Sequence, residues 1–418
     1  MREKDKQFKK NFIWNIIGTG FNAFNSLFFL VAVTRINGVE NAGIFTLAFS
    51  TACILYMIGI YAGRIYQVTE HDKSISNKDY IVNRIISCSI IILMVIAFVI
   101  IRQYDLYKSA IFIILAIYKS LEAFSEVIYG ILQKNDFLDK AGKSGFIKSV
   151  GSIILFIVTD LITENLICAC LSVVFVFIVT IIFYDYRQTK KFVTKEETIS
   201  KKNIISIFKN GFFPFIISFL GVFMVNAQKY AIDGVLTHDI QAIFGIIIMP
   251  ATVMGLLSQF LIHPYLNKIF ALHKTGQYLK IKKIIYKIIL IIFAIGILCS
   301  VLGYFLGTPI LGLIYSLDLS QYTLPLTIIL IASTFYTMAG ILSPILITMR
   351  YNFIQFVVYG IIAVFEWILS KILVANLGFY GAVWAYIITM IVYFVIFYIV
   401  AMIVINKCNK NVNGKEEN

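Results

Sequence analysis

The sequence predicts an all-α integral membrane protein with twelve transmembrane helices arranged as two six-helix parallel repeats around a central cavity. Three observations lead to this prediction. Long apolar segments follow one another along nearly the whole chain, 60% of the residues are hydrophobic, and only 14% are charged. A hydrocarbon core of about 30 Å needs about 20 apolar residues per helix, whereas soluble domains contain about 25% charged residues. Continuous apolar runs exclude a β-barrel, whose strands alternate apolar and polar residues.

The helices are predicted in chain order from apolar segments that are separated by charged or polar connections. The first six cover about 11–34, 42–65, 83–101, 107–132, 145–163 and 165–184. The last six cover about 210–236, 241–265, 284–307, 322–349, 352–375 and 379–405. Each segment is long enough to cross the bilayer as a helix.

The positions of Lys and Arg predict the orientation. Most of the 36 basic residues fall on one side, in the N-terminus, in the loops at 67–82, 133–144, 185–209 and 266–283, and in the C-terminal tail. Cytoplasmic loops carry an excess of Lys and Arg, so we expect both termini to be cytoplasmic in a bacterial inner (plasma) membrane. The net charge of +14 is then explained by anionic lipid, and no nucleic-acid partner is predicted. The first helix lacks a signal-peptide cleavage pattern, so we expect a retained span.

A polar stretch divides the chain into two halves. The predicted domains are an N-terminal bundle (1–184), a cytoplasmic linker (185–209), a C-terminal bundle (210–405) and a cytoplasmic tail (406–418). When the second half is aligned with the first at an offset of 199 residues, Asp239 aligns with Glu40. The loop at 266–283 then matches the loop at 67–82 in place and length. Six helices per half is an even number, which predicts parallel repeats with a substrate site between them.

Charged residues within the fourth predicted helix are the strongest functional signal. Lys119, Glu122 and Glu126 are spaced by three and four residues, which places them on one helical face. Charges in lipid cost about 2.5–3.5 kcal/mol each, so this face must meet protein or water. Two interpretations remain open at this stage: a Lys–Glu pair that holds helices together, or the wall of a cavity.

Two other predicted helices carry polar stripes. Asn226, Lys229 and Asp233 recur at helical spacing in the seventh helix, where Lys229 and Asp233 could pair. Asn22 and Asn25 lie on the first helix among small residues. Such a stripe is typical of either close helix packing or a wet cavity wall. Because the first and seventh helices are equivalent in the repeats, we expect both to face one central cavity.

Two isolated charges complete the candidate set. Arg64 lies at the cytoplasmic end of the second helix, where the bias of basic residues toward the cytoplasm also explains it. Glu366 lies within the eleventh helix, and Lys371 follows it at a spacing that does not favour pairing. A functional and a structural role are both open for Glu366.

Motifs of enzymatic chemistry are missing from the sequence. It contains no G-x-x-x-x-G-K-[ST] loop, no H-E-x-x-H and no zinc-ligand pattern. The six cysteines form neither a disulfide framework nor a metal pair. We therefore predict no catalytic residues, no metal and no cofactor.

Several short segments resemble the multidrug/oligosaccharidyl-lipid/polysaccharide exporter superfamily, in particular its Wzx-type polysaccharide flippases. They are Gln-Lys-Tyr-Ala-Ile-Asp ending at Asp233, Ala-Ile-Phe-Gly from Ala242, His-Pro-Tyr-Leu from His263, and Thr-Arg-Ile-Asn-Gly-Val-Glu-Asn-Ala-Gly-Ile-Phe ending at Phe45. The resemblance covers about 11–405. It implies two six-helix bundles in a V around a cavity that opens alternately to each side.

The resemblance also implies a substrate, an undecaprenyl-diphosphate-linked oligosaccharide for O-antigen or capsule, flipped to the outer leaflet and passed to polysaccharide-assembly proteins. Lys119, Lys229 and Arg64 would bind its phosphates, and Asn22, Asn25 and Asn226 its sugars. Glu122, Glu126, Asp233 and Glu366 are the candidates for coupling H⁺ or Na⁺. The alternatives are a cation-coupled multidrug antiporter of the same superfamily and a membrane-embedded polymerase or acyltransferase.

Overall fold

The computed structural model describes residues 2–61, 63–69, 75–194, 197–349 and 351–416. Regular structure in these residues is helical, apart from one isolated bridge between Asp233 and Leu236. The chain forms two compact units, Met1–Val222 and Phe223–Asn418. The division falls within the helix Lys201–Met224, which begins inside the linker predicted at 185–209.

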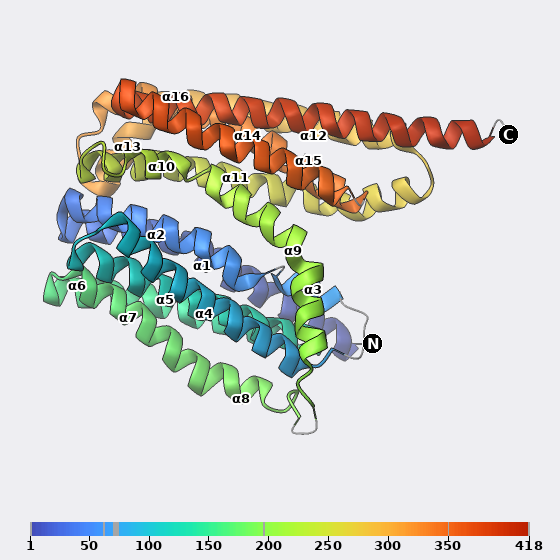
Figure 1. Cartoon of the computed structure of the whole chain (residues 1–418), viewed down its shortest axis with the longest axis horizontal. Helices are drawn as coiled ribbons and strands as arrows, with labels where there is room; N and C mark the ends of the chain where they lie inside the picture. Colours follow the sequence, from blue (N-terminus) through green and yellow to red (C-terminus); the bar gives the residue numbers. More distant parts are fainter. Residues whose placement is uncertain (1, 62, 70–74, 195–196, 350, 417–418) are drawn as a thin grey trace. The chain divides into compact units, whose positions relative to one another are not determined.

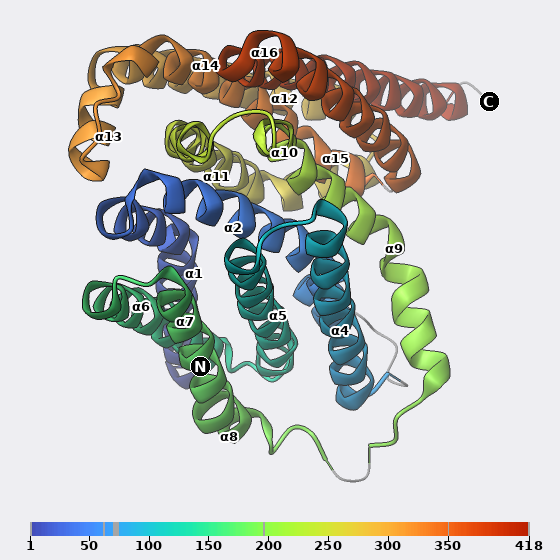
Figure 2. The same cartoon turned by 60° about the vertical axis from the view of Figure 1, so that its left-hand side comes forward.

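Unit 1 is a bundle of antiparallel helices, shown in blue to green in Figure 1. Its helices are α1 (Arg2–Ile36), α2 (Gly38–Ile60), α3 (Gly63–Thr69), α4 (Asn77–Arg102), α5 (Leu106–Lys134), α6 (Leu138–Thr163), α7 (Leu166–Thr180), α8 (Tyr186–Thr189) and α9 (Lys201–Met224). A π-helical turn, Ile181–Asp185, joins α7 to α8. Figure 2 shows the described irregular residues 190–194 after α8 and 197–200 before α9.

Helix α5 is the centre of unit 1. It packs against α2, α4, α6 and α7, and most of its side chains are buried. Its charged face therefore points into protein. Helices α1 and α6 cross closely, because a Cβ on Gly18 would clash with the carbonyl oxygen of Gly142. Small residues at a helix crossing allow this approach in a membrane.

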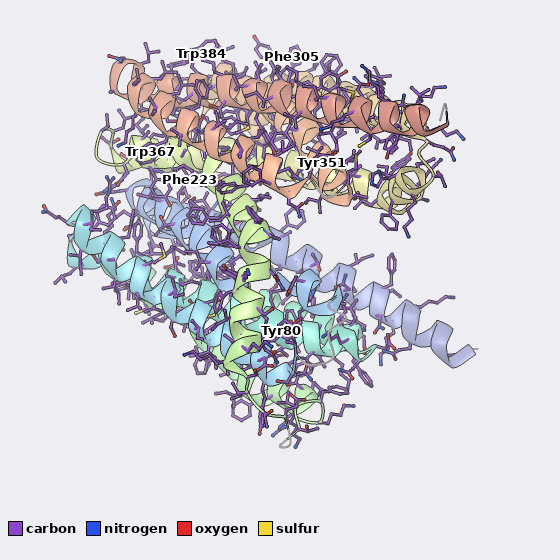
Figure 3. All side chains as sticks on the ribbon, turned by 45° about the vertical axis from the view of Figure 1, so that its right-hand side comes forward. Tyr80, Phe223, Phe305, Tyr351, Trp367 and Trp384 are labelled. Atoms are coloured by element: carbon purple, nitrogen blue, oxygen red, sulfur yellow. The ribbon has the colours of Figure 1, made fainter. Side chains whose placement is uncertain are left out.

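Unit 2 contains the remaining helices, shown in yellow-green to red in Figure 1. They are α10 (Ala227–Ile232), α11 (His238–Lys274), α12 (Tyr278–Leu302), α13 (Thr308–Tyr315), α14 (Thr323–Gly340), α15 (Leu342–Thr348) and α16 (Asn352–Glu416). Gly303–Gly307 is π-helical and Ser320–Tyr322 is a 3₁₀ turn. In Figure 3, Trp384 and Phe305 lie on the outer surface of unit 2, where they are 44% and 68% exposed.

Helix α16 consists of two halves joined at Gly378, whose backbone is not helical (φ 57°, ψ −131°). The hydroxyls of Tyr359 and Tyr393 are 2.7 Å apart although 34 residues separate them. A continuous helix would place these residues roughly 50 Å apart. The halves are therefore antiparallel neighbours, and the predicted break between 375 and 379 is confirmed.

Ten helices in the described part of the chain are long and apolar enough to cross a membrane. Helix α5 is not among them because Lys119, Glu122 and Glu126 interrupt its apolar run, and α16 counts once despite its break. The chain is thus an all-α, multi-pass membrane protein, as predicted. The number of twelve crossings and the parallel repeats stay predictions.

Three predicted helices are wrong in one respect, since each is divided in the structure. The segment 42–65 breaks at Tyr61, which has a positive φ of 28°. The segment 210–236 becomes α9 and α10, and α9 already begins at Lys201. The segment 322–349 is divided between α14 and α15 close to Pro344, which lacks an N–H for the helical ladder. Apolar length predicts where a chain crosses lipid but is insensitive to such breaks.

Candidate functional site in the two helical units

Unit 1 contains a polar cavity of about 130 Å³ between α1, α3, α5, α6 and α7. We call it the unit 1 cavity, and it is lined by Asn15, Gly18, Thr19, Asn22, Arg64, Glu122, Ser125, Glu126, Tyr129, Ala141, Gly142, Gly145, Lys148 and Phe177. The structure thus brings together four predicted site residues from three separate helices: Asn22, Arg64, Glu122 and Glu126.

The charges of α5 form a connected group at this cavity. Lys119 Nζ lies 2.6 Å from Glu122 Oε2, and Asn22 Nδ2 donates to Glu122 Oε1 at 3.1 Å. The Lys119 ammonium also lies 5.0 Å from the centre of the Phe49 ring and 4.8 Å from that of Tyr118. Lys119 is buried behind Glu122 and does not line the cavity. The structure therefore shows a Lys–Glu pair within α5, a hydrogen bond that joins its glutamate to α1, and the same carboxylate on a cavity wall.

Arg64 and Glu126 form a looser pair. Arg64 Nε is 3.7 Å from Glu126 Oε2, and about a quarter of each side chain is exposed (27% and 25%). Both residues also line a neighbouring cavity of about 300 Å³, whose wall includes Pro214 and Phe215 of α9. A partly exposed ion pair contributes little to stability, so Arg64 can exchange Glu126 for another anion at small cost.

A buried ion pair is the main feature that the sequence prediction missed. Lys148 and Asp185, 2% and 0% exposed, approach within 2.5 Å, and Lys148 also donates to Ser125 Oγ at 2.6 Å and to Tyr129 at 3.3 Å. Lys148 lies near the start of the predicted helix at 145–163, where the bias of basic residues toward the cytoplasm would also explain it. A lysine inside a predicted span is nevertheless the sequence feature that could have identified this site, because charge within a span is costly. Asp185 ends a π-helical turn. No sequence pattern predicts this local distortion, and π-helical turns are frequent at functional sites.

Arg84 lies at the start of the predicted helix at 83–101, and it is 4% exposed. Its guanidinium donates to the carbonyl of Gly59 near the end of α2. The last carbonyls of a helix have no partner within the helix, so Arg84 stabilises the break between α2 and α3, next to the segment that carries Arg64.

Unit 2 has a separate cavity of about 220 Å³, which we call the unit 2 cavity. It is lined by Val225, Asn226, Lys229, Ile248, Ala251, Thr252, Gly255, Tyr336 and Tyr386. Lys229 Nζ donates to Asn226 Oδ1 at 3.1 Å. Among these described lining residues there is one basic side chain and no acidic one, so the lining favours an anion.

Four of the predicted site residues do not line these cavities. Lys119 stands behind Glu122, and Asn25 is buried where it donates to Asn22 Oδ1 at 3.5 Å. Asp233 ends α10 in an extended conformation. Glu366 is fully buried. A single central cavity shared by the two units stays a prediction.

Within the residues that the structure describes, no group of three or more His, Cys, Asp or Glu side chains is placed to hold a metal ion. The polar groups of the two cavities are instead lysine, arginine, carboxylate, amide and phenol side chains. This donor set suits hydrogen bonding and charge pairing with a polar or anionic ligand.

The chain has the fold of the MATE transporters of the MOP superfamily. It matches an inward-facing multidrug resistance MATE transporter with a TM-score of 0.74 and 14% identity, over 95% of this chain and 99% of that one. An outward-facing MATE transporter gives 0.62 at 14% identity, over 97% and 96%. The Vibrio cholerae transporter VcmN in its bent form gives 0.60 at 12% identity, over 98% and 99%.

In sequence, the chain is similar to the capsular polysaccharide biosynthesis protein CapF of Staphylococcus aureus. The two are 27% identical over 352 residues, which are 82% of this chain and 86% of that protein. No family model matches the chain. The predicted resemblance to this superfamily is confirmed in the fold.

Proposed function

We propose that this protein is a flippase that moves undecaprenyl-diphosphate-linked oligosaccharide repeat units from the inner to the outer leaflet of a bacterial cytoplasmic membrane by alternating access. The observation that carries the proposal is that basic side chains line polar cavities within a MATE-type fold, Arg64 and Lys148 in unit 1 and Lys229 in unit 2. The similarity to a capsular polysaccharide biosynthesis protein supports the substrate class.

The chemistry of the unit 2 cavity fits such a substrate. Lys229 offers a point charge to a phosphate. Tyr336 and Tyr386 provide phenol rings and hydroxyls, and Asn226 an amide, for contacts with sugars. In unit 1, Arg64 can bind a phosphate oxygen when it leaves Glu126, and Asn22 offers an amide in the same cavity.

The residues that could couple transport to an ion gradient lie in the unit 1 cavity. Glu122 and Glu126 line it, so they are our candidates for binding H⁺ or Na⁺. Coupling is not required for outward movement of the headgroup. A headgroup of charge −2 moving out across an inside-negative potential gains about 4.6 kcal/mol per 100 mV.

A cation-coupled small-molecule antiporter is the second candidate. Two observations favour it: Glu122 and Glu126 line the unit 1 cavity, and the solved structures of this fold are multidrug transporters. Such a protein needs carboxylates to bind cations and gains nothing from Lys229 in the unit 2 cavity. The role of Lys229 therefore separates the two candidates.

The test is a mass-spectrometric comparison of lipid-linked oligosaccharides in cells with and without the protein. A flippase predicts that undecaprenyl-diphosphate repeat units accumulate in its absence, protected from an external glycosidase, because they stay in the inner leaflet. An unchanged lipid pool with normal surface polysaccharide would contradict the proposal and favour small-molecule export.

A further inference from the structure

Glu366 occupies the interior of unit 2, on the first half of α16. It is 0% exposed and is absent from the lining of the cavities described above. Its Oε1 accepts hydrogen bonds from Gln228 Nε2 of α10 and from Ser370 Oγ at 2.7 Å. Its Oε2 accepts one from Thr389 Oγ1, on the returning half of α16. One carboxyl group thus joins α10 to both halves of α16.

All of these donors are neutral. Among the described residues, no ion pair involves Glu366. The ammonium of Lys371 lies 4.4 Å from the centre of the Trp367 ring, and this lysine is exposed. An ionised carboxylate buried without a cation is strongly disfavoured, and such a group takes up a proton instead. The surroundings therefore suit a carboxylic acid better than a carboxylate.

The hydrogen-bond inventory around Gln228 agrees with a protonated acid. Gln228 is fully buried, and its Oε1 lacks a hydrogen-bond partner among the described residues. If Glu366 is ionised, it has no hydrogen to donate to that oxygen. If Glu366 is protonated on Oε2, its O–H can donate to Gln228 Oε1 while Gln228 Nε2 donates back to Oε1. This two-bond ring leaves the contacts from Ser370 and Thr389 intact and satisfies the amide oxygen.

Gln228 directly precedes Lys229 on α10, a helix of only six residues. A helix this short is not stable without tertiary contacts, so its rotation depends on what its buried side chains contact. Successive helical residues point about 100° apart. Gln228 can therefore face Glu366 while Lys229 faces the unit 2 cavity, and the pair sets the direction of Lys229 and of Asn226 just before it.

We propose that Glu366 is a carboxylic acid that is neutral at neutral pH and pairs with the Gln228 amide, and that it is a positioning residue for the cationic wall of the unit 2 cavity. It is then not one of the ion-coupling carboxylates. The titratable groups on the elements around it include Tyr386 on the returning half of α16, Tyr336 on α14, Lys229 on α10 and Lys371 on its own helix. The positioning part of the proposal rests on the proposed role of Lys229 in transport.

The protonation state is tested on the purified full-length protein, without any substrate. We expect the infrared difference spectrum between wild type and Glu366→Gln to show the C=O band of a protonated carboxylic acid at neutral pH. The band should return in the swapped variant Gln228→Glu/Glu366→Gln at the same neutral pH. A wild-type protein without this band would overturn the proposal, and this result is independent of what the protein transports.

Three variants test the positioning role. Glu366→Gln and the swapped variant keep a neutral two-bond pair, so they should retain wild-type export and an unchanged pH profile. Glu366→Leu removes the pair and should reduce export and lower the melting temperature. Loss of export in a Glu366→Gln protein that melts like wild type would instead assign Glu366 to ion coupling. If cells without the protein accumulate no lipid-linked repeat units, the flippase proposal fails while the infrared result stands.

Discussion

At the scale of single residues, Lys229 decides between the two functional candidates. It lines the unit 2 cavity, whose described wall contains no acidic side chain. We expect Lys229→Gln to abolish polysaccharide export at normal membrane abundance, because an amide cannot neutralise a phosphate. Lys371→Gln, on the exposed surface beside Trp367, is the matched control and should export normally. Wild-type export by Lys229→Gln would contradict the cationic cavity.

The pair between Lys148 and Asp185 predicts a stability effect. Both side chains are almost fully buried, so Lys148→Met leaves Asp185 as an uncompensated buried charge. Breaking such a pair costs about 3–5 kcal/mol, whereas replacing both partners with apolar residues is often neutral or stabilising. We expect Lys148→Met to lower the melting temperature of the purified protein strongly and Lys148→Met/Asp185→Leu to restore most of it. Equal melting of the single variant and wild type would contradict this assignment.

At the scale of elements, the crossing of α1 and α6 depends on a lack of side chains. A Cβ on Gly18 would meet the Gly142 carbonyl, whereas a Cβ on Gly20 of the same helix would meet nothing within 4 Å. Alanine is favoured over glycine in a helix by about 1 kcal/mol, so Gly20→Ala should be neutral or stabilising. Gly18→Ala should lower the melting temperature, because it forces two backbones apart. If both variants melt alike, the close crossing is not present in the protein.

At the scale of the whole molecule, the charge distribution predicts the topology. Basic residues concentrate on one side of the predicted helices, which places both termini in the cytoplasm. A fluorescent protein fused after Asn418 should fluoresce, and alkaline phosphatase at the same position should be inactive, because each folds on one side of the membrane only. Active phosphatase at this position would exclude an even number of crossings with a cytoplasmic N-terminus.

The candidate site was predictable where a charge interrupts an apolar run. Lys119, Glu122, Glu126 and Lys229 were found this way, since charge within a span is costly. Lys148 and Asp185 escaped because they lie near the ends of predicted spans, where basic residues and polar loops are expected anyway. The contact between Glu366 and Thr389 joins residues 23 positions apart. The turn at Gly378 brings the two side chains together, and no local sequence pattern predicts this.

Apolar length and composition by themselves determined that this chain is a helical, multi-pass membrane protein, because lipid leaves backbone polar groups no partner except within a helix. Spacing along one helix also determined which charges share a face. Only the tertiary structure decided which of them meet. It placed Arg64 of α3 beside Glu126 of α5 and Lys148 beside Asp185, and it buried Glu366 among neutral donors. Such pairings depend on helix breaks, rotations and crossings, which result from packing between segments far apart in the sequence.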